Sequence, residues 1–144
     1  MFTNTQDSSE RLTVWRGIRQ DTTIQSVEDI LTRFQSIKPK PRYIDYYTPS
    51  SWPNVFNIVT DGYFCQSGIT LVMAATMHYF RFINSDKIRL DAISNYETGA
   101  EGLVLVLDGF CYNFTPGQRV TLEYATQNST RYDSHIITID KLFD

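Results

Sequence analysis

The chain has 144 residues, of which 42% are hydrophobic and 20% charged, with a formal net charge of −3. These values are typical of one ordinary globular domain, here 1–144, and they argue against nucleic acid as the main partner, because such binding depends on neutralising phosphates. The longest apolar run, 69–80, is shorter than the roughly 20 residues of a bilayer span. We therefore expect a soluble, one-domain protein that does not enter a membrane.

The first residues, 1–12, are polar and are expected to form an arm or tail that becomes ordered only against a partner. No apolar secretory segment follows Met1, so the protein is expected in a cytoplasm with both of its cysteines reduced. The sequence contains no nucleotide-binding glycine spacing and no close pairs of Cys and His. It therefore predicts no cofactor and no metal site.

The N-terminal half, 13–82, shows helical periodicity in three places. The first predicted helix, 27–37, has Ser26 as its N-cap and ends where two prolines force an extended backbone. The second, 53–60, begins at a proline, and the third, 65–81, is apolar on nearly every side. A helix that is apolar all round belongs in the centre of a fold, so we expect the third helix to be buried.

The C-terminal half, 83–144, alternates apolar and polar residues as half-exposed strands do. Asp108 and Gly109 separate two such runs, and this dipeptide favours a tight hairpin turn. Strands are expected at 88–92, 103–107, 110–114, 119–125 and 135–139, with a loop over 126–134. The fold class is therefore α+β, with about three N-terminal helices packed on a four-stranded, mostly antiparallel sheet. The expected core residues are Trp52, Phe56, Val59, Ile69, Val72, Met73, Met77, Phe80, Val104 and Val106.

Cys65 is the strongest candidate for chemistry. It opens the third predicted helix, where the positive end of the helix dipole favours a thiolate. His78 lies too far along the same helix to reach it, whereas His135 is on a strand of the sheet that follows. Asp133 or Asp140 would then orient the imidazole ring. A buried, unreactive thiol at Cys65 is the alternative interpretation.

This order of elements, a cysteine at a helix start followed by a sheet that carries the histidine, resembles that of papain-like and cell-wall amidase cysteine hydrolases. The strings F-C-Q-S-G at 64–68 and S-H-I-I at 134–137 are similar to their motifs. The resemblance implies amide hydrolysis, with Cys65 as the nucleophile and His135 as its base. The sequence departs from the pattern because no aspartate precedes Cys65 and no glycine–aspartate turn precedes the histidine strand.

A second candidate surface lies in the linker 38–48, where positive charges stand beside tyrosines. Such a segment can follow a phosphate backbone and stack bases, or it can cover the core while its cations stay solvated. Tyrosine is also favoured at protein interfaces, so the linker is the predicted contact surface for a protein partner or a second copy of the chain. Its candidate binding residues are Lys38, Lys40, Arg42, Tyr43, Tyr46 and Tyr47.

The run S-W-P-N-V-F-N-I at 51–58, followed by G-Y-F-C at 62–65, resembles small uncharacterised proteins of large tailed bacteriophages. The resemblance implies a virus-encoded protein made in the cytoplasm of a bacterial host and incorporated in the virion. The first functional hypothesis is therefore a non-enzymatic interaction or assembly module, such as a phage structural component. A cysteine-dependent amide hydrolase that uses Cys65 and His135 is the alternative, and a nucleic-acid-binding protein is the second alternative.

Overall fold

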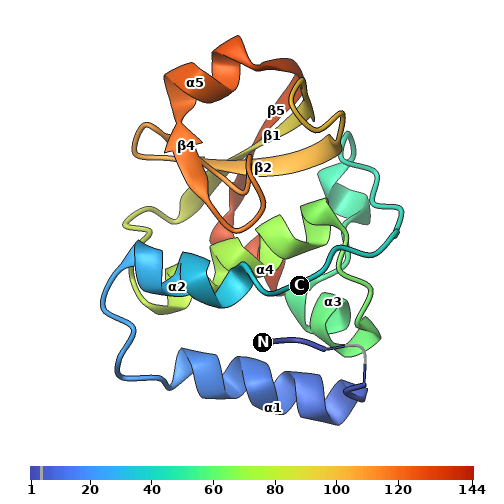
Figure 1. Cartoon of the computed structure of the whole chain (residues 1–144), viewed down its shortest axis with the longest axis vertical. Coiled ribbons are helices and arrows are strands. Elements are labelled where there is room, and N and C mark those ends of the chain that lie inside the picture. The colour runs from blue at the N-terminus through green and yellow to red at the C-terminus, as the bar shows by residue number, and fades with distance from the viewer. Residues whose placement is uncertain (4) are drawn as a thin grey trace.

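The computed structural model describes residues 1–3 and 5–144, and it confirms the α+β fold (Figure 1). Four helices precede the sheet: α1 (Ser8–Arg19), α2 (Val27–Phe34), α3 (Val55–Asp61) and α4 (Gln66–Tyr79). The strands are β1 (Lys87–Asn95), β2 (Glu101–Leu107), β3 (Phe110–Tyr112), β4 (Arg119–Thr121) and β5 (Ser129–Thr138), with α5 (Leu122–Gln127) between the last two. Two short 3₁₀ helices are η1 (Pro49–Ser51) and η2 (Ile139–Leu142). None of the described helices is both long and apolar enough to cross a membrane.

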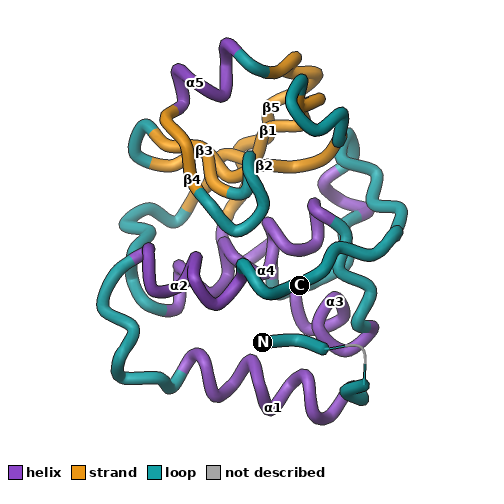
Figure 2. Tube along the Cα trace, viewed as in Figure 1, coloured by secondary structure: helices purple, strands orange, loops and turns teal. Residues whose placement is uncertain are grey.

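The sheet is antiparallel throughout, with the strand order β4-β3-β2-β1-β5. Helix α4 packs on one face of the sheet, mainly against β2, and α2 and α3 pack against α4 from the other side. Helix α1 forms the outermost layer against α3. Figure 1 shows α5 on the side of the sheet away from α4, and Figure 2 shows the long loop that joins α2 to α3 along one side of the molecule.

Helix α4 is the centre of the fold, as its apolar sequence predicts. Every residue from Ser67 to Met77 is buried, including Thr70 and Thr76 at 0% exposure. Two buried hydrogen bonds stabilise it. The Trp15 indole Nε1 donates to Thr76 Oγ1 at 3.1 Å, and Thr76 Oγ1 donates to the carbonyl of Val72. A buried hydroxyl therefore links α1 to α4.

The N-terminal segment differs from the arm predicted over 1–12. Helix α1 begins at Ser8, capped by Asp7 in a capping box with Glu10. Its inward face is Arg11, Trp15 and Ile18, and the charged Arg11 interrupts the apolar pattern that would have marked a helix. The buried guanidinium donates to the backbone carbonyl of Val59 at 2.8 Å. The prediction of a loose arm is therefore wrong for 8–12, and residue 4 lies outside the described residues.

The sheet of the described residues has five strands, whereas the predicted fold class had a four-stranded sheet although five strand segments were expected along the chain. The predicted strand 119–125 ends at Thr121, whose side chain accepts a hydrogen bond from the Tyr124 N–H and caps α5. The segment 126–134, predicted as a loop, contains the first half of β5. This strand is polar because it is an edge strand of the sheet and none of its residues is fully buried. The hairpin turn is confirmed, with φ of 52° at Asp108 and 80° at Gly109.

Most of the predicted core is buried, but Phe56 is not. Val59, Ile69, Val72, Met73, Met77 and Val104 are buried, whereas Trp52, Phe80 and Val106 are partly exposed. Phe56 is 40% exposed because α3 turns Val55, Ile58 and Val59 inward, at spacings of three and four residues. Its ring instead lies edge-on to Trp15, with the ring centroids 5.4 Å apart.

The start of α4 is held on the start of β2 by a small set of contacts, which we call the α4–β2 clasp: Ser67, Thr70, Gly102 and Leu103. Ser67 Oγ accepts from the Leu103 N–H at 3.0 Å, and Thr70 Oγ1 donates to the Leu103 carbonyl at 2.8 Å. Both bonds are buried. A Cβ at Gly102 would lie 2.8 Å from Ser67 Oγ, so the approach of helix and strand requires glycine there.

We predict that Gly102→Ala lowers the free energy of unfolding by about 1–3 kcal/mol, because the new methyl group pushes Ser67 away from β2. Removing the opposing hydroxyl in the double variant Gly102→Ala, Ser67→Ala should restore part of that loss. Gly17→Ala is the matched control, because nothing lies within 4 Å of a Cβ there and alanine should stabilise the exposed helix by roughly 0.5–1 kcal/mol. Urea unfolding measures all three, and equal stability of Gly102→Ala and wild type would contradict the clasp.

Candidate functional site

Cys65 is the N-cap residue of α4. Its backbone is extended, with φ −75° and ψ 168°, and its Sγ accepts a hydrogen bond from the Gly68 N–H at 3.4 Å. Cys65 is half-buried as a residue, whereas the rest of the first turn of α4 is largely buried. Cys65 therefore presents a sulfur at the positive end of a 14-residue helix, which is the position that the sequence predicts for it.

Cys65 lines a cavity of about 460 Å³. Four segments form its walls: the extended linker at 39–41, the first turn of α4, the β1–β2 connection and the β3–β4 turn. Most of the lining is apolar, contributed by Pro39, Pro41, Ile69, Ala100, Phe114 and Pro116. The other described cavities are smaller, between about 230 and 380 Å³. An apolar cavity with a few polar groups is the usual form of a ligand site.

Glu101 is one polar group of this cavity. It is exposed at the start of β2, and its Oε2 accepts a hydrogen bond from the Tyr46 hydroxyl at 2.7 Å. This bond and burial raise the pKa of Tyr46 well above its usual range, so the phenol keeps its proton at neutral pH. Tyr46 therefore donates to a carboxylate at the mouth of the cavity and does not act as a base there.

Asn113 is the second polar group, and its side chain fixes the shape of the cavity. It is 2% exposed and has a left-handed backbone, with φ 67°. Its amide donates to the Gln66 carbonyl and to Thr70 Oγ1, and its Oδ1 accepts from the Gly117 N–H. The amide therefore ties the β3–β4 turn to the first turns of α4. Sequence reasoning missed Glu101 and Asn113 because only tertiary packing brings these separate turns to Cys65.

His135 lies outside the cavity that contains Cys65. Its Nε2 is 2.7 Å from the Tyr46 carbonyl, its ring packs edge-on against Trp52, and Asp133 Oδ2 is 3.7 Å away. His135 is on β5, which pairs with β1. Strand β1 therefore lies between the His135 strand and β2, the strand that contains the clasp residues Gly102 and Leu103. His135 therefore has the Tyr46 carbonyl as its hydrogen-bond partner and Asp133 as the neighbouring carboxylate. Within the described residues, His135 and Cys65 do not contact each other. The dyad stays a prediction.

Asp140, the other proposed orienting group, is exposed in the short helix η2, after the end of β5. His78 is near the C-terminal end of α4, with its ring centroid 6.3 Å from that of Phe143. Neither residue lines the Cys65 cavity. The described residues contain no group of three or more His, Cys, Asp or Glu side chains arranged to hold a metal ion.

The basic, tyrosine-rich linker is partly engaged within the molecule. Arg42 pairs with Asp61 at 3.1 Å, and the Lys40 ammonium lies over the ring of Tyr63, 5.8 Å from its centroid. Tyr43 is 86% exposed. Of the other candidates, Lys38 and Tyr47 are exposed, and Tyr46 bonds Glu101. The linker therefore borders the cavity through Pro39, Lys40 and Pro41, and nucleic-acid binding by it stays a prediction.

Comparison with known proteins shows a likeness of fold. No family model and no curated protein matches this sequence. Solved structures of LapG from Legionella pneumophila do match: one described as calcium-bound, with a TM-score of 0.65, and two others, one described as EGTA-treated, with TM-scores of 0.67. Sequence identity is 12% in each case, and the matches cover 93–94% of this chain and 78–82% of the LapG chains. At this identity the likeness establishes the fold and no more.

We predict that iodoacetamide alkylates Cys65 at least about tenfold faster than Cys111 in the folded protein at pH 8. Cys111 is 1% exposed, and burial together with the nearby Asp91 carboxylate raises the pKa of its thiol to about 12. Peptide mass spectrometry after timed quenching measures both rates in one sample, and urea-unfolded protein is the control in which the two rates should converge. Equal, slow labelling of both cysteines until unfolding would contradict the exposed position of Cys65.

Proposed function

We propose that this protein is an interaction module that binds a segment of polypeptide in the Cys65 cavity. The observation that carries the proposal is the composition of that cavity, in which apolar walls enclose a helix N-terminus at Cys65 and a carboxylate at Glu101. The proposal develops the interaction module expected from the sequence and gives it a site. A role in a virion stays a prediction that the fold does not bear on.

An amide group matches this cavity because it offers both an acceptor and a donor. The first N–H groups of a helix have no partner within the helix, so the start of α4 can donate to a carbonyl oxygen of the ligand. Glu101 can accept from a backbone N–H or an amine of the same segment. The proline and phenylalanine side chains of the lining bury apolar side chains between these two polar ends.

Binding is favoured over hydrolysis because no imidazole lines the Cys65 cavity among the described residues, and the carboxylate that does line it, Glu101, already accepts a hydrogen bond from the Tyr46 hydroxyl. Cysteine hydrolysis needs a partner that removes the thiol proton and returns it to the leaving amine. The imidazole of His135 is committed to the Tyr46 carbonyl. Tyr46 itself keeps its proton because its bond to Glu101 raises its pKa.

A second candidate function is a cysteine-dependent amide hydrolase of papain-like type. The observation that favours it is the N-cap position of Cys65, where the sulfur accepts a hydrogen bond from the Gly68 N–H and lines the cavity. A ligand amide held as described above would lie beside that sulfur. For the dyad to form, substrate binding would have to move the linker around Tyr46 and break the hydrogen bond between the Tyr46 carbonyl and His135.

The test is selection of random twelve-residue peptides on immobilised protein, with fluorescence anisotropy to measure the affinity of the enriched sequences. We predict that selected peptides slow the alkylation of Cys65 and bind at least about tenfold more weakly to Ala100→Trp, whose indole fills the cavity. Ser9→Trp, on the exposed face of α1, is the matched control and should bind as wild type does.

Mass spectrometry of the same peptides after incubation separates the two candidate functions. Intact peptides support the interaction module, whereas cleavage that disappears in Cys65→Ser supports the hydrolase. Enriched peptides that bind Ala100→Trp and wild type equally, and leave Cys65 unprotected, would refute a ligand site in this cavity.

A further inference from the structure

The face of the sheet away from α4 contains a second cavity of about 250 Å³, which is distinct from the Cys65 site. Its base is the apolar surface of Ile93 and Val104, and its wall is Leu122 and Ala125 of α5. Two arginines, Arg89 of β1 and Arg131 of β5, also line it. Nothing in the proposed function of the first cavity uses these residues.

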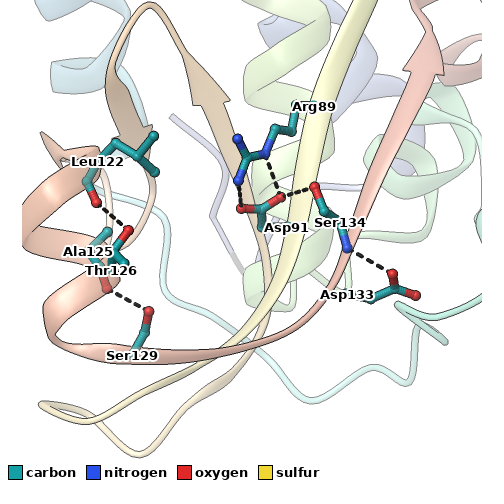
Figure 3. A network of polar contacts seen from close by, with 8 residues as sticks. All are labelled: Arg89, Asp91, Leu122, Ala125, Thr126, Ser129, Asp133 and Ser134. Atoms are coloured by element: carbon teal, nitrogen blue, oxygen red, sulfur yellow. Dashed lines mark hydrogen bonds and ion pairs between the residues drawn. The ribbon is translucent and has the colours of Figure 1, made fainter.

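Arg89 is held in place by a buried carboxylate. Its Nε and Nη2 donate to the two oxygens of Asp91 at 2.9 Å each, and Asp91 is 3% exposed. Ser134 Oγ donates to the same carboxylate from the neighbouring strand at 2.6 Å. Figure 3 shows this network, with the Arg89–Asp91 pair on β1, Ser134 on β5 and the residues of α5 on the other side of the pair. A guanidinium fixed along one edge keeps its remaining N–H groups oriented.

The donors left in the cavity are those of the two arginines. Thr126 and Ser129 use their hydroxyl hydrogens on the carbonyls of Leu122 and Ala125, as Figure 3 also shows. Arg89 Nη1 and the guanidinium of Arg131 have no hydrogen-bond partner among the described residues. The cavity therefore presents two cations and one already paired carboxylate, which leaves one positive charge uncompensated.

We propose that this cavity binds a small organic carboxylate, with its carboxylate between Arg89 and Arg131 and its apolar body against Ile93, Val104 and Leu122. One uncompensated positive charge matches a monoanion, and the paired Asp91 carboxylate disfavours a dianion such as phosphate. The volume suits a ligand of about ten non-hydrogen atoms, smaller than the drug-sized ligands of larger sites. The apolar base of the cavity favours an organic ligand over an inorganic anion, because only an organic ligand has apolar surface to bury against it.

Sodium benzoate is the probe, titrated into ¹⁵N-labelled protein at constant ionic strength. We expect saturable shifts in the amide signals of Ile93, Val104 and Ala125, with the signals around Cys65 unchanged. Benzyl alcohol, which has the same ring without the charge, should bind at least about tenfold more weakly. Arg131→Gln should weaken benzoate by a similar factor, whereas Arg16→Gln, the same change on the exposed face of α1, should not.

Three outcomes would overturn the proposal: no saturable shift up to about 50 mM benzoate, equal affinity of benzoate for Arg131→Gln and wild type, or tighter binding of phosphate than of benzoate. Arg131 is exposed, so its replacement should leave the fold intact, which the spectrum of the free variant checks directly. Arg131→Lys, which keeps the charge, should recover part of the affinity and so separates electrostatic binding from a change of fold.

Discussion

The fold depends on the contact between the first turns of α4 and the first residues of β2. Ser67 and Thr70 satisfy both backbone groups of Leu103, so a buried helix approaches a buried strand without leaving a polar group unpaired. Gly102 permits that approach because it has no Cβ to meet Ser67. The same contact sets the position of Cys65, since the N-cap is one turn from the clasp. The clasp therefore determines both how α4 packs on the sheet and where Cys65 lies.

The Asn113 side chain extends this arrangement to the far turn of the sheet. Its amide reaches the Gln66 carbonyl and Thr70 Oγ1, so the clasp residue Thr70 contacts both β2 and the β3–β4 turn. The left-handed backbone of Asn113 costs on the order of 1 kcal/mol for a residue other than glycine. Three hydrogen bonds from the same side chain offset that strain. The buried Asn113 side chain consequently fixes one wall of the cavity beside Cys65.

The two faces of the sheet have different chemistry because of the strand alternation. On β1, Leu90 and Ala92 face α4 and are fully buried, whereas Arg89 and Asp91 face the side covered by α5. The α4 face is sealed by a long apolar helix, but α5 is only six residues long. The second face is therefore less completely covered, which leaves room for a charged network beside an apolar floor.

Local patterns in the sequence predicted the parts of the fold that depend on local chemistry. Ser26 as a cap, the apolar α4 and the turn at Asp108 were all recognisable because each needs only neighbouring residues. Helix α1 was missed because the buried Arg11 reads as a surface residue until its carbonyl partners on α3 are known. The candidate nucleophile Cys65 was predictable from its helix position. Glu101 and Asn113 were not, since they reach the cavity only through the β1–β2 and β3–β4 connections.

Cys65 lines its cavity, and His135 lies outside that cavity. The most direct measurement is the rate of Cys65 alkylation between pH 6 and 10 in wild type and in His135→Ala, followed by mass spectrometry of the labelled peptide. We predict the same pH–rate curve for both proteins, because the His135 imidazole is bound to the Tyr46 carbonyl and its strand β5 is separated from β2 by β1. A curve that shifts to higher pH when His135 is removed would show that the imidazole acts on the thiol, and it would contradict this account.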